Sequence, residues 1–281
     1  MSTLVCAPAL LQQRLALADG SDPSEASDVD FDCSCKSNVS GKGPSFRVDK
    51  SGAGGARTSL AAAIADARTA WQYSGDPAPA TIELAAGTYR ERAVLDFPCR
   101  IRAAPGSGPA PTIVWETDAP YESTVVVMAP GTSIKGVNIK HRSPSVANNF
   151  AVYVMQGASL SVAKSTVTSQ TGAGLAVEGG CLEMRGVTVD SCAGVGVQCL
   201  ASIEGDAEGR LAMGECVLRG NGGGGLLARG GVQVCATQVD IEGNGGPGVQ
   251  VADARVLTWQ DIRYNKNKGG NIKKGPGVTG L

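Results

Sequence analysis

One supersecondary unit repeats five times between residues 150 and 274. Each copy contains an anchor residue that is followed four residues later by a glycine. Successive anchors are separated by 22, 29, 23 and 21 residues, and no helical periodicity falls inside a copy. A β-rich repeat of this length predicts a parallel β-helix, in which each copy forms one coil. The anchors are Gln170, Cys192, Asn221, Asn244 and Asn265, and the glycines are Gly174, Gly196, Gly225, Gly248 and Gly269.

Counting from the anchors aligns the coils with one another. Three positions in each coil are almost always apolar and alternate with polar positions, so we expect their side chains to point into the core. Three residues before the anchors lie Val167, Val189, Leu218, Ile241 and Ile262. Five residues after them lie Leu175, Val197, Leu226, Val249 and Gly270. Seven residues after them lie Val177, Cys199, Ala228, Val251 and Ile272.

The position two residues before each anchor is polar, and we expect it to point outward. Its charge alternates in sign from the second coil onward, and neighbouring strands lie about 4.8 Å apart, so each charge has an opposite neighbour. Such cross-strand pairs contribute about 0.2–1 kcal/mol each, and we interpret the row as structural. It comprises Thr168, Asp190, Arg219, Glu242 and Arg263. On the adjacent position we expect Asp240 to stack beside Asp261 as a solvated like-charged pair.

Residues 1–45 differ in composition from the rest of the chain. Carboxylates alternate there with Ser, Gly and Pro, a composition that cannot bury a core. We therefore expect a flexible acidic N-terminal tail over residues 1–45 and a β-helix domain over residues 46–281. The carboxylates are Asp19, Asp22, Glu25, Asp28, Asp30 and Asp32.

A single amphipathic helix is expected before the first coils, over residues 58–71. Leu60, Ile64, Ala67 and Trp71 fall on one face of it, and Thr58 or Ser59 can act as the N-cap. An open β-helix exposes its apolar interior at the end of the stack. This helix therefore predicts an N-terminal cap over the core.

Irregular opening coils are expected between the helix and the repeats. Apolar runs separated by turns predict strands at residues 81–84, 99–102, 112–115, 124–127 and 134–139. The longer third coil holds an acidic insertion over residues 202–210, which we interpret as a surface loop. Lysines in the last coil discourage the addition of a further strand. They are Lys266, Lys268, Lys273 and Lys274.

Composition excludes several classes of protein. The net charge is −1, which argues against a nucleic-acid partner, and no apolar run is long enough to predict a membrane span. The N-terminus lacks a secretory signal, and five of the nine cysteines occupy apolar or corner positions that suit reduced thiols. These observations predict an intracellular, most simply cytoplasmic, protein, with organelle import left open. The five cysteines are Cys181, Cys192, Cys199, Cys216 and Cys235.

Residues 81–139 resemble the opening coils of pectin-lyase-like right-handed β-helix proteins, through TIELAAGTYRE, FPCRIRAAPGSGPAPTIV and GTSIKGVNIKH. The later units, such as CVLRGNGGGGLLARGG and QVDIEGNGGPGVQVAD, resemble the β-helix repeats of certain F-box adaptors and of the SHC-binding family. The resemblance covers about residues 46–275 and implies an all-β, right-handed parallel β-helix with an N-terminal capping helix. It carries little information on function, because this fold hosts both enzymes and binding modules.

The opening also resembles pectin methylesterases, through RVDKSGAGGARTSLAAAIADA and GVNIKHRSPSVANNFAVYV. That family uses a glutamine and two aspartates, one as nucleophile and one for proton transfer. Here Asn149 stands in place of the glutamine, Gln170-Thr171-Gly172-Ala173 holds no aspartate, and the next coil has Ala193. We therefore assign no catalytic, cofactor-binding or metal-binding residue, and expect no cofactor.

One local group of residues is nevertheless compatible with carbohydrate chemistry. His141 is the only histidine in the chain, and it falls near Tyr121, Phe150 and Tyr153, with Glu122 or Glu178 close by. The group predicts a groove on coils two to four. The neighbouring Lys140 and Arg142 would lower the pKa of His141.

Two hypotheses for function follow. The first is a non-catalytic module that presents a rigid surface to another protein, as a scaffold, subunit or adaptor of an intracellular assembly. The alternative is a divergent carbohydrate-active enzyme, similar to pectin esterases or lyases, that acts on a polysaccharide. The missing catalytic carboxylates favour the first, and the aromatic group beside His141 favours the second.

Overall fold

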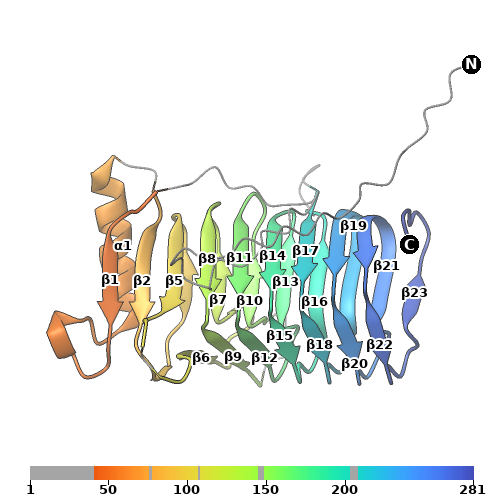
Figure 1. Ribbon diagram of the computed structural model, residues 1–281, viewed down its shortest axis with the longest axis horizontal. Helices are drawn as coiled ribbons and strands as arrows, with labels where there is room; N and C mark the ends of the chain where they lie inside the picture. The colour runs from red at the N-terminus through yellow and green to blue at the C-terminus, as the bar shows by residue number, and fades with distance from the viewer. Residues whose placement is uncertain (1–40, 76–77, 107, 145–148, 203–207) are drawn as a thin grey trace, which may run out of the picture. The chain divides into compact units, whose positions relative to one another are not determined.

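The computed structural model describes residues 41–75, 78–106, 108–144, 149–202 and 208–281. These residues form a parallel β-helix, as predicted, whose coils stack along one axis (Figure 1). The expected acidic tail lies outside the described residues except for positions 41–45, and the centre of the acidic insertion, 203–207, also lies outside them. In the described part of the chain, no helix combines the length and the apolar character needed to cross a membrane.

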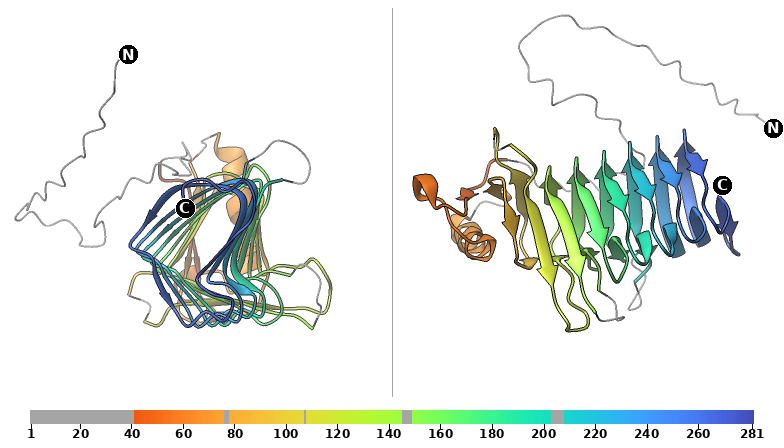
Figure 2. Two further views of the ribbon diagram at one scale, coloured as in Figure 1. Left: turned by 90° about the vertical axis from the view of Figure 1, so that its right-hand side faces the viewer. Right: turned by 90° about the horizontal axis from the view of Figure 1, so that it is seen from below.

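A complete coil contributes one strand to each of three faces, and all of the strand pairs between coils are parallel. The view along the stack shows the coils superposed (Figure 2, left). The first face contains β1 (Ser45–Val48), β2 (Ala80–Leu84), β5 (Cys99–Ala103), β8 (Thr132–Lys135), β11 (Ser159–Ala163), β14 (Cys181–Arg185) and β17 (Arg210–Gly214). The second face contains β4 (Ala93–Leu95), β7 (Val125–Val127), β10 (Val152–Val154), β13 (Leu175–Glu178), β16 (Val195–Leu200) and β23 (Ile272–Lys274). The third face contains β3 (Thr88–Tyr89), β6 (Thr112–Glu116), β9 (Asn138–Arg142), β12 (Thr166–Ser169), β15 (Thr188–Asp190), β18 (Val217–Arg219), β20 (Asp240–Glu242) and β22 (Arg263–Asn265).

Two long strands, β19 (Gly224–Thr237) and β21 (Val249–Gln260), run from the second face into the first. They therefore join these two faces into one 15-stranded sheet, while the third face is a separate 8-stranded sheet.

Left-handed backbone conformations form the corners between faces. The segment 134–139, predicted as one strand, is divided between β8 and β9, because Gly136 has φ +69° and turns the chain from the first face to the third. The equivalent corner of later coils is occupied by Lys164, Gly186, Glu215, Gln238 and Asp261, all with positive φ. Single residues with positive φ, unlike regular strand residues, bend the chain sharply enough to close a coil.

The inward rows are those predicted for the first four repeats and differ in the fifth. Leu175, Val197, Leu226 and Val249 are paired in register and fully or almost fully buried, but the row continues with Ile272 and not with Gly270. Similarly, Ile241 pairs with Tyr264 and not with Ile262, and Val251 pairs with Lys274 and not with Ile272. The fifth repeat is therefore displaced by two residues from the predicted alignment.

A ladder of asparagine side chains explains this displacement. The backbone N–H of Asn221 donates to Oδ1 of Asn244 (2.9 Å), and the backbone N–H of Asn244 donates to Oδ1 of Asn267 (3.2 Å). The fifth anchor is thus Asn267, not Asn265. It follows Lys266, whose φ is +52°, as Asn244 follows Gly243. Asn265 matched the Asn-x-x-x-Gly pattern in sequence, but the corner conformation selects Asn267.

The glycine four residues after an anchor is required by close approach between coils. A Cβ at Gly196 would lie 2.7 Å from Nδ2 of Asn221 and 2.8 Å from the carbonyl oxygen of Gly225. Real Cβ atoms do not approach other atoms so closely, so the anchor and its glycine form one structural unit.

The predicted outward row of charges is confirmed at Asp190 and Arg219 and is wrong at its last position, Arg263. Arg219 forms an ion pair with Asp190 (3.2 Å), as predicted. Because of the two-residue displacement, Glu242 pairs in register with Asn265, and Arg263 binds Asp240. Asp240 therefore stacks beside a guanidinium and not beside Asp261, and the predicted like-charged pair is wrong.

The predicted capping helix is α1 (Leu60–Ser74), preceded by a short 3-10 turn, η2 (Ala53–Gly55). Its buried residues Leu60, Ala63, Ile64 and Ala67 join the core beside β1 and β2. Ser59 is the N-cap. The carboxylate of Glu91, from the next coil, accepts hydrogen bonds from the backbone N–H of Leu60 (3.0 Å) and Ala61 (2.8 Å). A negative charge at this end also complements the helix dipole.

Four of the five repeat cysteines are buried free thiols, as predicted: Cys192, Cys199, Cys216 and Cys235. Cys181 is the exception, because it takes part in a disulfide. The interpretation of all five as reduced core thiols is therefore wrong at Cys181.

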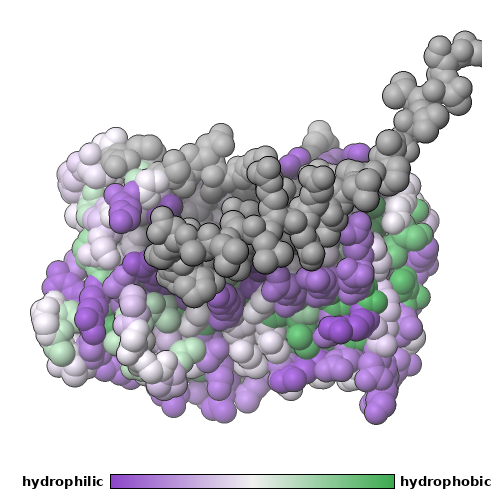
Figure 3. Space-filling model, viewed as in Figure 1, coloured by the Kyte–Doolittle hydropathy of each residue, from purple (hydrophilic) through white to green (hydrophobic). Residues whose placement is uncertain are grey.

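Apolar surface is exposed near the end of the stack formed by β21 and β23 (Figure 3). Leu257 and Ile272 are 45% and 38% exposed. Ile272 continues the inward row of Val249, so its exposure marks the last coil of the core among the described residues.

Replacing Glu91 with alanine is expected to lower the free energy of unfolding by about 1–3 kcal/mol, because the first turn of α1 loses its charged acceptor. Urea denaturation measures this difference. Glu116→Ala is the control, since Glu116 is exposed and its ion pairs with Arg90 and Arg142 are long, at 3.8 and 3.9 Å. Equal stability of the Glu91→Ala and Glu116→Ala proteins would contradict the capping role.

Asn244→Ala is expected to cost about 3 kcal/mol or more, because the buried backbone N–H of Asn221 loses its acceptor and the ladder is interrupted. Asn265→Ala provides a matched control: Asn265 is exposed and outside the ladder, and its replacement is expected to cost less than about 0.5 kcal/mol. The same denaturation experiment compares the two. A larger loss of unfolding free energy in Asn265→Ala than in Asn244→Ala would instead identify Asn265 as the anchor of the fifth repeat.

Candidate functional site

The residues that the sequence singled out lie at the turn from the third face to the second and on the second face itself. His141 is on β9, Tyr153 is on β10, and Glu122 lies in the connection between β6 and β7. Tyr153 pairs in register with Val126 on one side and Ala176 on the other, on the outward side of the second face. The stacked coils therefore bring these side chains together from segments that are separate in sequence.

Glu122 is the best-held carboxylate in this region. Its Oε2 accepts hydrogen bonds from Oγ1 of Thr117 (2.7 Å) and Nε1 of Trp115 (3.2 Å), and Arg92 lies 3.9 Å from its Oε1. The hydrogen bonds from Thr117 and Trp115 lower the pKa of Glu122. The carboxylate is therefore ionised at neutral pH and bound to an indole ring.

His141 is buried within the turn, at 1% exposure. Its Nδ1 lies 3.0 Å from the hydroxyl of Thr124, while its Nε2 has no hydrogen-bond partner among the described residues. Burial, helped by the positive charge of Arg92, lowers its pKa to about 4. The direction agrees with the sequence prediction, but the cause is burial first and Arg92 second, not Lys140 or Arg142.

Tyr153 repeats the pairing of ring and carboxylate one coil away. Its hydroxyl donates to Oε2 of Glu178 (2.7 Å), and its ring packs on that of Phe150 with 5.6 Å between centroids. Burial and the hydrogen bond to Glu178 raise the pKa of Tyr153. We call Trp115, Glu122, Phe150, Tyr153 and Glu178 the ring–carboxylate cluster.

Asn149, which stands where the esterase pattern has glutamine, is structural here. It is fully buried, and its Oδ1 accepts a hydrogen bond from the backbone N–H of Glu122 (2.9 Å). Its Nδ2 donates to the carbonyl oxygen of Ala119 (3.1 Å) and to the hydroxyl of Ser143 (2.8 Å). Asn149 thus holds the turn that presents Glu122 and the 70% exposed Tyr121.

The arrangement is suited to binding and poorly suited to proton transfer. Glu122 is stabilised as the anion, His141 as the neutral ring, and Tyr153 as the neutral phenol. General acid–base catalysis at neutral pH is most efficient when the group titrates near pH 7, and the pKa shifts of these three groups all lead away from that value. Sequence reasoning named Glu122, His141, Phe150, Tyr153 and Glu178 but missed Trp115, whose register opposite His141 would have revealed it.

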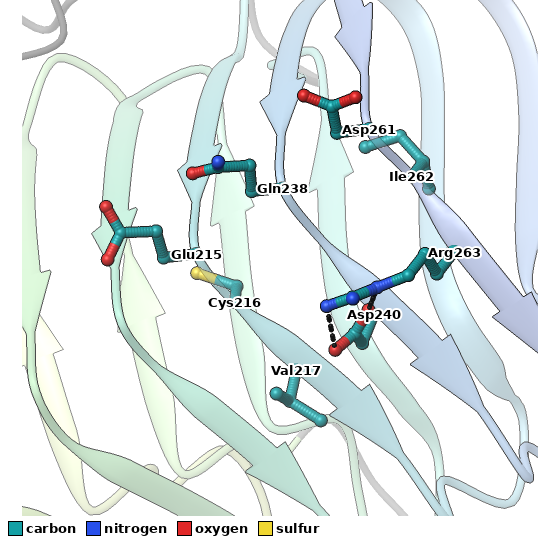
Figure 4. Close-up of a pocket in the computed structure, with 8 residues that line it drawn as sticks. All are labelled: Glu215, Cys216, Val217, Gln238, Asp240, Asp261, Ile262 and Arg263. Carbon is teal, nitrogen blue, oxygen red and sulfur yellow. Dashed lines mark hydrogen bonds and ion pairs between the residues drawn. The ribbon is translucent and has the colours of Figure 1, made fainter.

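A recess lies on the third face of the last coils, away from the predicted coils two to four. It is a groove of about 690 Å³ that opens over β18, β20 and β22 (Figure 4). Arg263 makes a two-pronged contact with Asp240 inside it, at 2.5 and 2.9 Å. Along its edge lie Glu215, Gln238 and Asp261, one from each coil. Nothing in the sequence analysis predicted this groove.

The buried neutral His141 makes stability depend on pH. Between about pH 6.5 and pH 4 the unfolded chain takes up a proton at His141 that the folded protein does not, so stability falls as the pH falls through this window. The unfolding free energy that is lost through His141 approaches about 3 kcal/mol and does not increase further below this pH window. In urea denaturation at pH 7 and pH 4, the stability difference between the wild type and His141→Gln should change by about this amount. A constant difference would show that His141 is not held neutral.

Comparison with known proteins gives similarity in structure only. No protein-family model matches the chain, and no curated protein matches its sequence. Among solved structures, the pectin methylesterase of Aspergillus niger superposes with a TM-score of 0.54 at 13% identity, covering 88% of this chain and 93% of that one. The pectate lyase Pel9A superposes with a TM-score of 0.52 at 13% identity, covering 86% and 78%.

Identities this low carry over the arrangement of strands and no residue roles. The parallel faces, the helix α1 before the first coils and the extent of the superpositions agree with one another. The chain therefore has the pectin-lyase-like fold, a right-handed parallel β-helix with a helix at its N-terminal end.

Proposed function

We propose that this protein binds a polysaccharide, and that the ring–carboxylate cluster makes the principal contacts. The observation that carries the proposal is the repeated pairing of an aromatic donor with a carboxylate. Trp115 donates to Glu122, and Tyr153 donates to Glu178. The first pair lies at the turn between the third and second faces, and the second lies on the outward side of the second face, between neighbouring coils.

A sugar ring presents apolar C–H groups on its faces and hydroxyl groups around its edge. An aromatic ring packs against the first, and a carboxylate accepts hydrogen bonds from the second. Because the two pairs come from successive coils, they suit successive units of a chain better than a single small molecule. Binding sites of this kind combine apolar area with a few well-placed polar groups.

The structural neighbours support the same class of ligand. Their names, pectin methylesterase and pectate lyase, describe enzymes of a polysaccharide. This is support at the level of the fold, which also hosts binding modules. The protonation states of Glu122, His141 and Tyr153 favour binding over bond cleavage, so the proposal is for recognition.

The hypothesis of a protein scaffold and that of an intracellular location stay predictions from sequence. The ring–carboxylate cluster tests neither of these two hypotheses. Its contacts support the proposal of polysaccharide binding.

Tyr153→Ala and Glu178→Gln are each expected to weaken polysaccharide binding about tenfold or more, because either change breaks a ring–carboxylate pair; tenfold corresponds to about 1.4 kcal/mol. Affinity electrophoresis against neutral and acidic polysaccharides measures the effect. The matched controls are Tyr73→Ala, an exposed ring on α1, and Glu183→Gln, on the outward side of β14. Thermal unfolding checks that each variant is folded.

Two results would overturn the proposal. One is a wild-type protein that binds none of the polysaccharides. The other is a loss of binding in the Tyr73→Ala or Glu183→Gln protein as large as that in the cluster variants.

A further inference from the structure

The groove on the third face extends beyond the recess in Figure 4. A second cavity, of about 230 Å³, shares Asp240 and Arg263 with this recess. A third cavity, of about 360 Å³, shares Glu242 and Asn265 with the second. Together the three run along β18, β20 and β22, from the corner that opens the third face to the corner that closes it. The path follows the strand direction and matches an extended chain of a few residues, at about 3.3 Å per residue.

The charges in this groove divide into a compensated and an uncompensated set. Asp240 is neutralised by Arg263 and Asp190 by Arg219. The side-chain carboxylates of Glu215, Glu242 and Asp261 form no hydrogen bond or ion pair with the described part of the chain. Asp261 is nevertheless near enough to Arg263 to add to the rise that Asp240 causes in the pKa of that guanidinium. Only Lys266 brings a further positive charge to the lining. The groove therefore presents a surplus of free carboxylates on both sides of the Asp240–Arg263 pair.

The remaining lining argues against a sugar as the occupant of this groove. Its floor consists of aliphatic and thiol side chains, Val217, Ile262 and the buried Cys216, and none of the described lining residues is aromatic. A sugar chain would lack the ring platform that the ring–carboxylate cluster provides. Aliphatic floor and free carboxylates instead suit the methylene stems and cationic ends of lysine and arginine.

The edge residues are also held in place before any ligand arrives. Glu215, Gln238 and Asp261 occupy the same corner of three successive coils, with φ of +55°, +56° and +53°. Their backbones are fixed by parallel pairing of the coils, so their side chains leave the corner at regular intervals. Preorganisation of this kind reduces the entropic cost of binding.

We propose that this groove binds an extended segment of another protein in which lysine or arginine alternates with small residues. In an extended segment alternate side chains point the same way, so its basic residues face Glu215, Glu242 and Asp261 while the backbone follows β20. The proposal concerns a different ligand and a different face from the polysaccharide proposal, and either can fail without the other.

The test uses the full chain and an eight-residue fluorescent peptide in which lysine and threonine alternate, with a glutamate–threonine peptide as the control probe. Fluorescence anisotropy at low salt should show binding of the lysine peptide alone, and weaker binding as salt is added. The double variant Glu215→Gln, Asp261→Asn should bind at least about fivefold more weakly, since each exposed charge pair contributes up to about 1 kcal/mol.

A matched control double variant is Glu183→Gln, Asp253→Asn. This variant also loses one glutamate and one aspartate, but both lie outside the groove. Asp253, like Asp261, has positive φ. Its affinity for the lysine peptide should stay within about twofold of the wild type. Thermal unfolding of both double variants verifies that the coils are intact.

The variant Arg263→Gln distinguishes a groove that selects cationic side chains from one that binds any polar ligand. Removing the guanidinium frees the Asp240 carboxylate for the peptide, so binding should become several-fold tighter. An occupant that uses Arg263, such as an anionic peptide or a sugar acid, would bind more weakly to this variant. Absence of binding by the wild type, loss of binding in the control double variant, or weaker binding by Arg263→Gln would each overturn the proposal.

Discussion

The structure depends on parallel pairing between successive coils, which places every residue directly beside its counterpart one coil away. Strands paired in this way lie about 4.8 Å apart, so a row must be filled by side chains that tolerate like neighbours. Aliphatic residues do so in the core, and asparagine does so at the corner, where each amide serves as both donor and acceptor along the ladder of Asn221, Asn244 and Asn267. Glycine is needed wherever two backbones approach more closely than a Cβ allows.

This constraint acts on the inward positions and leaves the outward ones free to differ. The two surfaces considered for function use that freedom in opposite ways. At the turn before the second face and on that face itself, carboxylates accept hydrogen bonds from aromatic donors, which places apolar area beside them. In the groove on the third face, two carboxylates form ion pairs with arginines, and three form no ion pair within the described residues. The same rigid frame thus presents a surface suited to sugars and another suited to cations, separated by several coils.

Particular residues show how far sequence reasoning reached. The helix from Leu60, the opening strands and the first four repeats were predicted, because apolar alternation and the anchor–glycine spacing report directly on which side of a strand a residue faces. The fifth repeat was misaligned by two residues, because Asn265 and Asn267 are equally plausible anchors until the positive φ of Lys266 distinguishes them. Glu122, His141 and Tyr153 were recognised as a group, whereas Trp115 and the groove were not, since both depend on the register between coils.

The sequence by itself determined the coil, its period and its interior, because these follow from periodic apolar residues and from glycines at corners. Only the tertiary structure decided which outward side chains meet. Register between coils is a cooperative property of the whole stack, and a shift of two residues preserves the inward pattern while replacing every outward neighbour. That is why Asp240 binds Arg263 and not its expected neighbour Asp261, and why the candidate sites became visible only in the folded protein.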